Sequence, residues 1–169
     1  MKAGHEPSFW NLANVNSPLR TATLACFVAV LSYYAAKLGG TLIVGPQADW
    51  PLWLGNVLLV SILLLVPRRI WPILVAAAFA ASFLYNVQAG LSIRSSAFLV
   101  LSDTAEILTA ALCLRYAFRG VPQLNSVRAL AKFSFFAVII PPFIGAFFVA
   151  LVADKNYWTS WRIYFFRRR

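Results

Sequence analysis

The chain has 169 residues, of which 61% are hydrophobic and only 12% are charged. Soluble globular proteins average roughly 45–50% apolar and about 25% charged residues. With 15 Lys and Arg against 5 Asp and Glu, the formal net charge is +10. This composition excludes an ordinary soluble domain, which could not bury so much apolar surface. It indicates an all-α fold, a polytopic transmembrane helix bundle.

Five apolar runs follow a polar N-terminal segment, residues 1–20, which we expect to lie in the cytoplasm. Each run approaches the ~20 residues that a helix needs to cross a hydrocarbon core of about 30 Å. Two glycines, Gly39 and Gly40, are expected to break the first helix, and Pro141-Pro142 is expected to kink the fifth. The predicted spans cover about residues 21–38, 50–66, 70–87, 95–116 and 132–153.

Residues 154–169 form a tail that is rich in aromatic and basic residues. Aromatic side chains at this density are typical of a membrane interface. We therefore predict that the tail is the start of a truncated sixth helix, and that the chain is a fragment of a longer membrane domain.

The basic residues fall mainly between the apolar runs, which favours contacts with lipid headgroups over a nucleic-acid surface. No nucleic-acid partner is expected. The positive-inside rule places the N-terminus in the cytoplasm, because that orientation puts more cations inside. The inside segments would hold Lys2, Arg20, Arg68, Arg69, Arg115, Arg119, Arg128 and Lys132, and the outside segments before the tail Lys37, Arg94 and Lys155.

Several local patterns together resemble the MASE1 domain, a membrane-associated sensor of bacterial signalling proteins. The similarity covers roughly residues 48–162 and rests on the order and spacing of motifs, none of which is specific alone. Asp103 stands where the family usually has Asn. The matching elements are Pro67-Arg68-Arg69-Ile70-Trp71-Pro72, Asn86, Ser102-Asp103-Thr104-Ala105-Glu106, the loop from Leu124 to Phe133, Gly145, and the pair Trp158 and Trp161.

This resemblance implies a multi-pass domain in the bacterial plasma membrane. Members of the family continue with further membrane helices and a histidine-kinase, diguanylate-cyclase or PAS output domain. Any catalysis would lie in such an output domain. The chain itself carries no Gly-rich phosphate loop, HExxH or GxSxG motif, and its one histidine, His5, lies in the polar N-terminal segment. We expect no catalytic residue, cofactor or metal.

The fourth apolar run contains the main candidate for chemistry, Asp103 and Glu106 near its midpoint. A charged carboxylate at that depth costs on the order of 3 kcal/mol or more. A spacing of three residues places both acids on one side of a helix. The predicted intramembrane polar site comprises Ser102, Asp103, Glu106, Thr109 and Asn86.

Two interpretations of these polar residues remain open. One is a ligand-binding or proton-sensitive site inside the bundle. The other is interhelical hydrogen bonding that fixes helix packing. Candidate partners for such bonds are Asn56, Ser82, Tyr85 and Asn86.

The leading functional hypothesis is a sensory input module that passes a stimulus to a cytoplasmic output domain. The alternatives are a small transporter or channel subunit, in which Asp103 and Glu106 line an ion path, and an assembly subunit of a larger membrane complex. The expected partners are the lipid bilayer and either other membrane helices or a cytoplasmic signalling domain.

Overall fold

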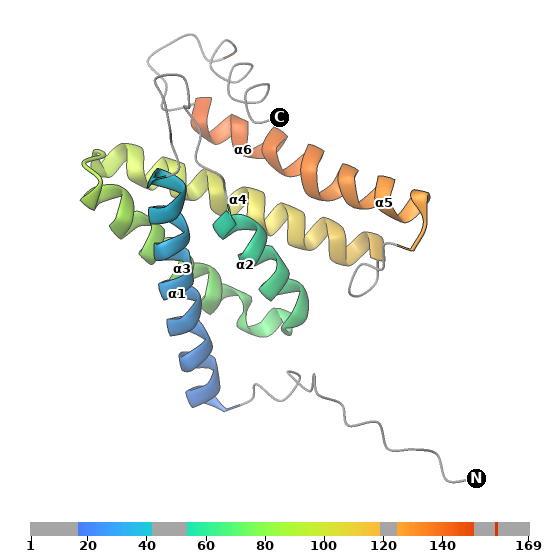
Figure 1. The fold of residues 1–169 in the computed structure, drawn as a ribbon, viewed down its shortest axis with the longest axis horizontal. Helices are drawn as coiled ribbons and strands as arrows, with labels where there is room; N and C mark the ends of the chain where they lie inside the picture. Colours follow the sequence, from blue (N-terminus) through green and yellow to red (C-terminus); the bar gives the residue numbers. More distant parts are fainter. Residues whose placement is uncertain (1–16, 42–53, 119–124, 151–157, 159–169) are drawn as a thin grey trace.

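The computed structural model describes residues 17–41, 54–118, 125–150 and 158. Six α-helices account for most of this part of the chain (Figure 1). The expected all-helical membrane bundle is confirmed. The helices are α1 (Pro18–Thr41), α2 (Leu54–Leu65), α3 (Trp71–Gln88), α4 (Ile93–Phe118), α5 (Val127–Ser134) and α6 (Ile140–Ala150).

Within the described ranges, four helical segments have the length and apolar composition of a membrane span. They contain 24, 21, 26 and 21 residues and cover Pro18–Thr41, Arg68–Gln88, Ile93–Phe118 and Val127–Phe147. The second predicted span corresponds to α2, which has 12 helical residues. At 1.5 Å per residue, α2 is about 18 Å long and shorter than a full span. Residues 50–53 of that predicted span, and most of the predicted tail, lie outside the described residues.

The helices alternate in direction, so that the ends of α1 and α3 lie on one side of the bundle and the ends of α2 and α4 on the other. Gly40 near the end of α1 contacts Tyr85 near the end of α3. At the opposite side, Arg115 near the end of α4 donates a hydrogen bond to the carbonyl of Val66, which follows α2. α6 packs against α4 and runs in the opposite direction, and α5 precedes it along the same course (Figure 1).

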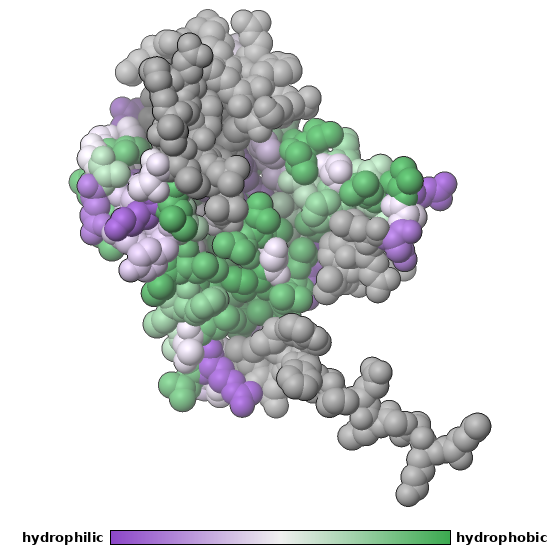
Figure 2. All heavy atoms as spheres, viewed as in Figure 1, coloured by the Kyte–Doolittle hydropathy of each residue, from purple (hydrophilic) through white to green (hydrophobic). Residues whose placement is uncertain are grey.

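The central core lies where α1, α2, α3 and α4 meet. Its largest fully buried aliphatic side chains include Val28 from α1, Leu63 from α2 and Leu74 from α3. Ile107 and Ala111 complete the same cluster from α4. Much of the outward surface is also apolar, as the green area on the face drawn in Figure 2 shows. Large exposed apolar side chains occur on every described helix, among them Phe27, Val57, Ile73, Leu101, Val127 and Phe143. A surface of this kind suits contact with lipid.

The two prolines of the last span are accommodated by a local change in helix type. Pro141 and Pro142 have no backbone N–H. Two carbonyl groups in the preceding turn therefore lack their usual hydrogen-bond donor. The segment Phe135–Ile139 is π-helical, and the N–H of Ile140 bonds to the carbonyl of Phe135. Single π-turns inside α-helices absorb such disruptions. The chain therefore remains helical from Val127 to Ala150.

Trp71 joins three helix ends at the side of the bundle that carries most of the arginines. Its indole N–H and the Arg115 guanidinium both donate to the Val66 carbonyl, at 3.3 and 3.2 Å. The guanidinium carbons of Arg115 and Arg68 lie 5.5 and 6.0 Å from the ring centre. A carbonyl at a helix C-terminus lacks an intrahelical partner and attracts cations. Trp71 is therefore a buried link between α2, α3 and α4.

We expect Trp71→Ala to lower the free energy of unfolding in detergent by about 3 kcal/mol, because it empties a packed site and removes an indole donor. Tyr116→Ala is the control, since Tyr116 lies one residue beyond Arg115 and is 84% exposed. Thermal or denaturant unfolding of both variants measures the difference. Equal stability of the two variants would contradict the buried-link role of Trp71.

Candidate functional site

A cavity of about 440 Å³ lies between α1, α2, α3 and α4. It occupies the half of the bundle that is remote from Trp71 and Arg115, as its lining residues come from the later turns of α1 and α3 and the earlier turns of α2 and α4. The residues that line it are Ser32, Ala35, Ala36, Gly39, Gly40, Gly55, Asn56, Leu59, Val75, Ala78, Phe79, Ser82, Tyr85, Asn86, Ala89, Leu91, Leu99, Val100, Asp103, Thr104 and Ile107.

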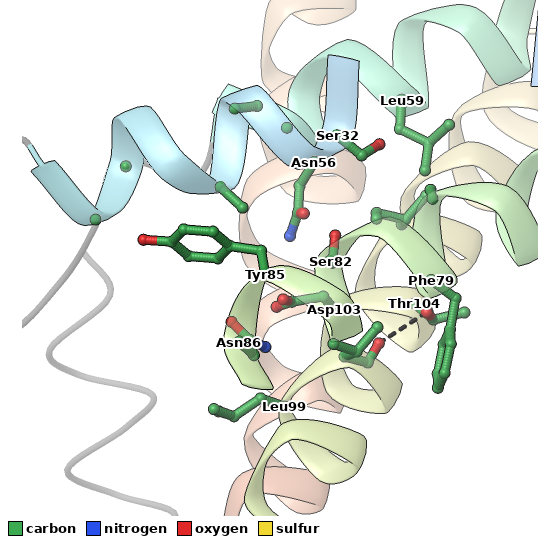
Figure 3. A pocket seen from close by; sticks show the side chains of 18 of the residues that line it. Ser32, Asn56, Leu59, Phe79, Ser82, Tyr85, Asn86, Leu99, Asp103 and Thr104 are labelled. Atoms are coloured by element: carbon green, nitrogen blue, oxygen red, sulfur yellow. Dashed lines mark hydrogen bonds between the residues drawn. The ribbon is translucent and has the colours of Figure 1, made fainter. Parts of the chain in front are cut away.

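Polar side chains from three helices meet at this cavity. Figure 3 shows the polar ends of Asn56 from α2, Ser82 and Asn86 from α3, and Asp103 from α4 turned toward the same space. Asp103 is only 9% exposed. The four residues considered above as interhelical partners of the acids, Asn56, Ser82, Tyr85 and Asn86, all line the cavity with Asp103.

Small residues create the space. Gly39 and Gly40 were expected to break the first helix, but α1 continues through them to Thr41, and both line the cavity. A side-chain Cβ at Gly40 would overlap the Tyr85 hydroxyl. Gly55 and Ala78 contribute short walls from α2 and α3. The sequence analysis did not predict that Gly39 and Gly40 line a cavity, because glycine is more often interpreted as a helix breaker.

The second acid, Glu106, lies on the same side of α4 as helical spacing predicts, but it faces a different neighbour. Its carboxyl group packs against Gly145 of α6, where a Cβ would overlap it. One turn earlier, the Ser102 hydroxyl donates a 2.9 Å hydrogen bond to the Gly145 carbonyl. Ser102 is fully buried and Glu106 is 6% exposed. Gly145 thus allows α6 to approach the polar side of α4 closely.

The predicted polar site is therefore divided between two places. Asp103 and Asn86 line the cavity, whereas Ser102 and Glu106 form the contact with α6. Thr109 is half-buried and is not among the described residues that line the cavity. Thr104, which was not selected from the sequence, lines the cavity and donates a 2.7 Å hydrogen bond to the Val100 carbonyl one turn earlier.

Two tyrosines link α1 and α3 beside the cavity. The Tyr33 hydroxyl of α1 donates a 2.6 Å hydrogen bond to Gln88 at the end of α3. Its ring meets that of Tyr85 edge to face, with centroids 5.9 Å apart. These contacts hold the ends of α1 and α3 together beside the cavity.

The fold and the buried polar groups define a helical membrane domain with an internal cavity. The chain belongs to the MASE1 family, whose model matches residues 24–161. MASE1 domains are membrane-associated sensory domains of signalling proteins and are not catalytic. Neither the curated proteins nor the solved structures contain a match to the chain.

We expect Gly145→Ala to destabilise the bundle by about 1–3 kcal/mol, because the added methyl group overlaps the Glu106 carboxyl and must displace it or α6. Glu106→Ala should make room for the same methyl group. The loss caused by Gly145→Ala should therefore be smaller in the Glu106→Ala background, and a double-mutant cycle of unfolding free energies measures this coupling.

Gly40→Ala serves as the comparison, since its methyl group meets the far end of the Tyr85 side chain, which can move. A smaller loss is expected there than at Gly145. Strict additivity of Gly145→Ala and Glu106→Ala would mean that the close contact between α4 and α6 does not determine stability.

Proposed function

We propose that this chain is the sensory input module of a bacterial signalling protein, in which a stimulus or partner bound in the helix bundle changes the cytoplasmic helix ends and biases an output domain. The observation that carries the proposal is the placement of two features on one helix. Asp103 of α4 lines the cavity, and Arg115 of the same helix binds the ends of α2 and α3. They are twelve positions apart along the helix, about 18 Å at 1.5 Å per residue.

The distribution of basic residues supports an N-in orientation in the plasma membrane. The helix ends on the side of Trp71 carry Arg20, Arg68, Arg69, Arg115, Arg128 and Lys132. The helix ends on the side of the cavity carry Lys37 and Arg94 within the described part of the chain. Because cytoplasmic loops are enriched in Lys and Arg, the side of Trp71 faces the cytoplasm and the cavity lies toward the outside.

The contacts of α4 provide a route from the cavity to the cytoplasmic side. A displacement of α4 at Asp103 would also move α6, because Ser102 and Glu106 of α4 both contact Gly145 of α6. It would also move Arg115 relative to Trp71 and the Val66 carbonyl. A stimulus can shift such an equilibrium only by binding one arrangement of the helices more tightly than the other.

Reporter fusions test the orientation. Fusions after Arg69 and after Arg119 should report the cytoplasm, and a fusion after Gly90 should report the outside, because of the cation asymmetry. An external signal after Arg119 would overturn the orientation.

Signalling is tested in the native protein, together with the sequence that follows residue 169 in its gene. A kinase, cyclase or PAS domain in that sequence would support the proposal, and Arg115→Gln should then change output activity about fivefold or more, as expected for a typical coupling energy. Arg94→Gln is the matched control, since Arg94 is exposed at the other end of α4. It should leave the output unchanged.

Unfolding in detergent is measured beside output activity, so that loss of assembly is not mistaken for loss of coupling. Equal outputs of wild type and Arg115→Gln would contradict the proposed route. A proton or cation flux through proteoliposomes that carry the wild-type chain would favour the transporter alternative, in which Asp103 lines an ion path.

A further inference from the structure

We propose that α5 binds the headgroup of an anionic phospholipid through Arg128 and Lys132, at the point where the segment Val127–Phe147 enters the membrane. The group recognised is the phosphate of a lipid with a net negative charge, such as phosphatidylglycerol. Three observations carry this proposal: the helical register of the two cations, their exposure without a protein partner, and the apolar surface that continues from α5 into α6. The binding does not depend on the function proposed above.

The start of α5 fixes the register of the two cations. Ser126 caps the helix, because its hydroxyl accepts a 3.2 Å hydrogen bond from the N–H of Ala129. Arg128 and Lys132 are four positions apart in this helix, so their side chains leave it on the same side. Like charges at this spacing repel each other and lower the stability of a helix. An anion between the two cations would remove this repulsion.

Neither cation takes part in the packing of the bundle. No residue of α5 is buried, and Arg128 and Lys132 are both exposed. Within the described part of the chain, neither side chain forms a hydrogen bond or an ion pair. By contrast, Arg115 at the end of α4 donates to the Val66 carbonyl and lies over the Trp71 ring. The charges on α5 are therefore accessible to a group outside the bundle.

The helix that carries the two cations continues as a membrane span. Val127–Phe147 has the length and apolar composition of a span, and its 21 residues measure about 31 Å at 1.5 Å per residue. Large exposed apolar side chains occur along its whole length, from Val127 and Leu130 to Phe143 and Phe147. Figure 2 shows hydrophilic residues at the end of the molecule where α5 begins, next to an apolar surface. Lipid, rather than a soluble protein, suits such a surface.

The depth of the two cations matches the level of the lipid phosphates. Lys132 lies five positions after the first residue of the span, about 8 Å along the helix axis. Because a charge inside hydrocarbon is costly, a long basic side chain at that depth extends toward the headgroups. Phosphate oxygens there accept charge-assisted hydrogen bonds from ammonium and guanidinium groups.

Charge favours an anionic lipid over a zwitterionic one. No Asp or Glu occurs in the sequence between Glu106 and Asp154, so α5 and the segments on either side of it carry only basic charges. A choline headgroup would bring a further positive charge close to Arg128 and Lys132. A phosphatidylglycerol headgroup brings the phosphate without that charge, and each cation near an anionic lipid surface strengthens binding about fivefold.

Two lipids with the same acyl chains test the proposal: dioleoylphosphatidylglycerol and dioleoylphosphatidylcholine. The full chain in a neutral detergent is titrated with each lipid, and native mass spectrometry measures the fraction of the chain that carries a bound lipid. We expect wild type to bind phosphatidylglycerol at least about tenfold more tightly than phosphatidylcholine, because two cations each contribute about fivefold.

The double variant Arg128→Gln/Lys132→Gln should bind phosphatidylglycerol about tenfold or more weakly and leave phosphatidylcholine binding unchanged. Lys37→Gln/Arg94→Gln is the matched control, because it removes two exposed cations at the other side of the bundle. It should bind both lipids as wild type does. Thermal unfolding in lipid-free detergent establishes that each variant is folded, and the comparison of the two lipids in wild type needs no variant.

Equal affinity of wild type for the two lipids would overturn the proposal, as would unchanged phosphatidylglycerol binding in the folded Arg128→Gln/Lys132→Gln variant. An equal loss in the control variant would also overturn it, since this would indicate a general effect of net charge. If a pentaglutamate peptide bound wild type more tightly than phosphatidylglycerol does, and required Arg128 and Lys132, an acidic protein partner would replace the lipid. These measurements involve no output domain, so their failure leaves the function proposed above standing.

Discussion

The structure depends on one constraint: a polar group inside the membrane has no water to bond and must find its partner in the protein. In the described bundle this demand is concentrated on α4, which carries the buried polar residues Ser96, Ser102, Asp103 and Glu106. A helix with these residues cannot face lipid along those positions. α4 therefore takes a central position, with α2 and α3 on one side and α6 on another.

The polar residues of α4 have two different surroundings: some contact α6 directly, and others line the cavity. Toward α6, Ser102 and Glu106 meet a glycine, so the contact is close and the polar groups bond or pack directly. Toward α1, α2 and α3, Asp103 meets short side chains and amides, so a cavity remains. The two acids thus have different surroundings on one helix: Asp103 lines a cavity, and Glu106 packs against α6.

The arginine-rich side of the bundle shows how charge assists packing as well as topology. From the sequence, Arg115 was interpreted as a topology determinant, with contact to anionic lipid or a cytoplasmic partner as the alternative. It also covers the Trp71 ring and satisfies the Val66 carbonyl at the end of α2. Such a contact joins the ends of α2, α3 and α4 on the positively charged side of the bundle.

Much of the fold and part of the site could be predicted from the sequence. Composition and apolar run length determine membrane helices, because a bilayer admits few other structures. Motif order indicates the MASE1 family, and an acid within an apolar run marks a position that must face protein. The start of α3 at Trp71-Pro72 follows equally from proline at the first turn of a helix.

Only the tertiary structure decided which polar residue meets which neighbour. Helical spacing put Asp103 and Glu106 on one side of α4, but it does not specify the helices that pack there. Glu106 meets Gly145, which lies 39 positions later, and Asp103 shares a cavity with Gly39 and Asn56, far earlier in the chain. A cavity arises where small residues from several helices coincide in space, and periodicity within one helix carries no information about that coincidence.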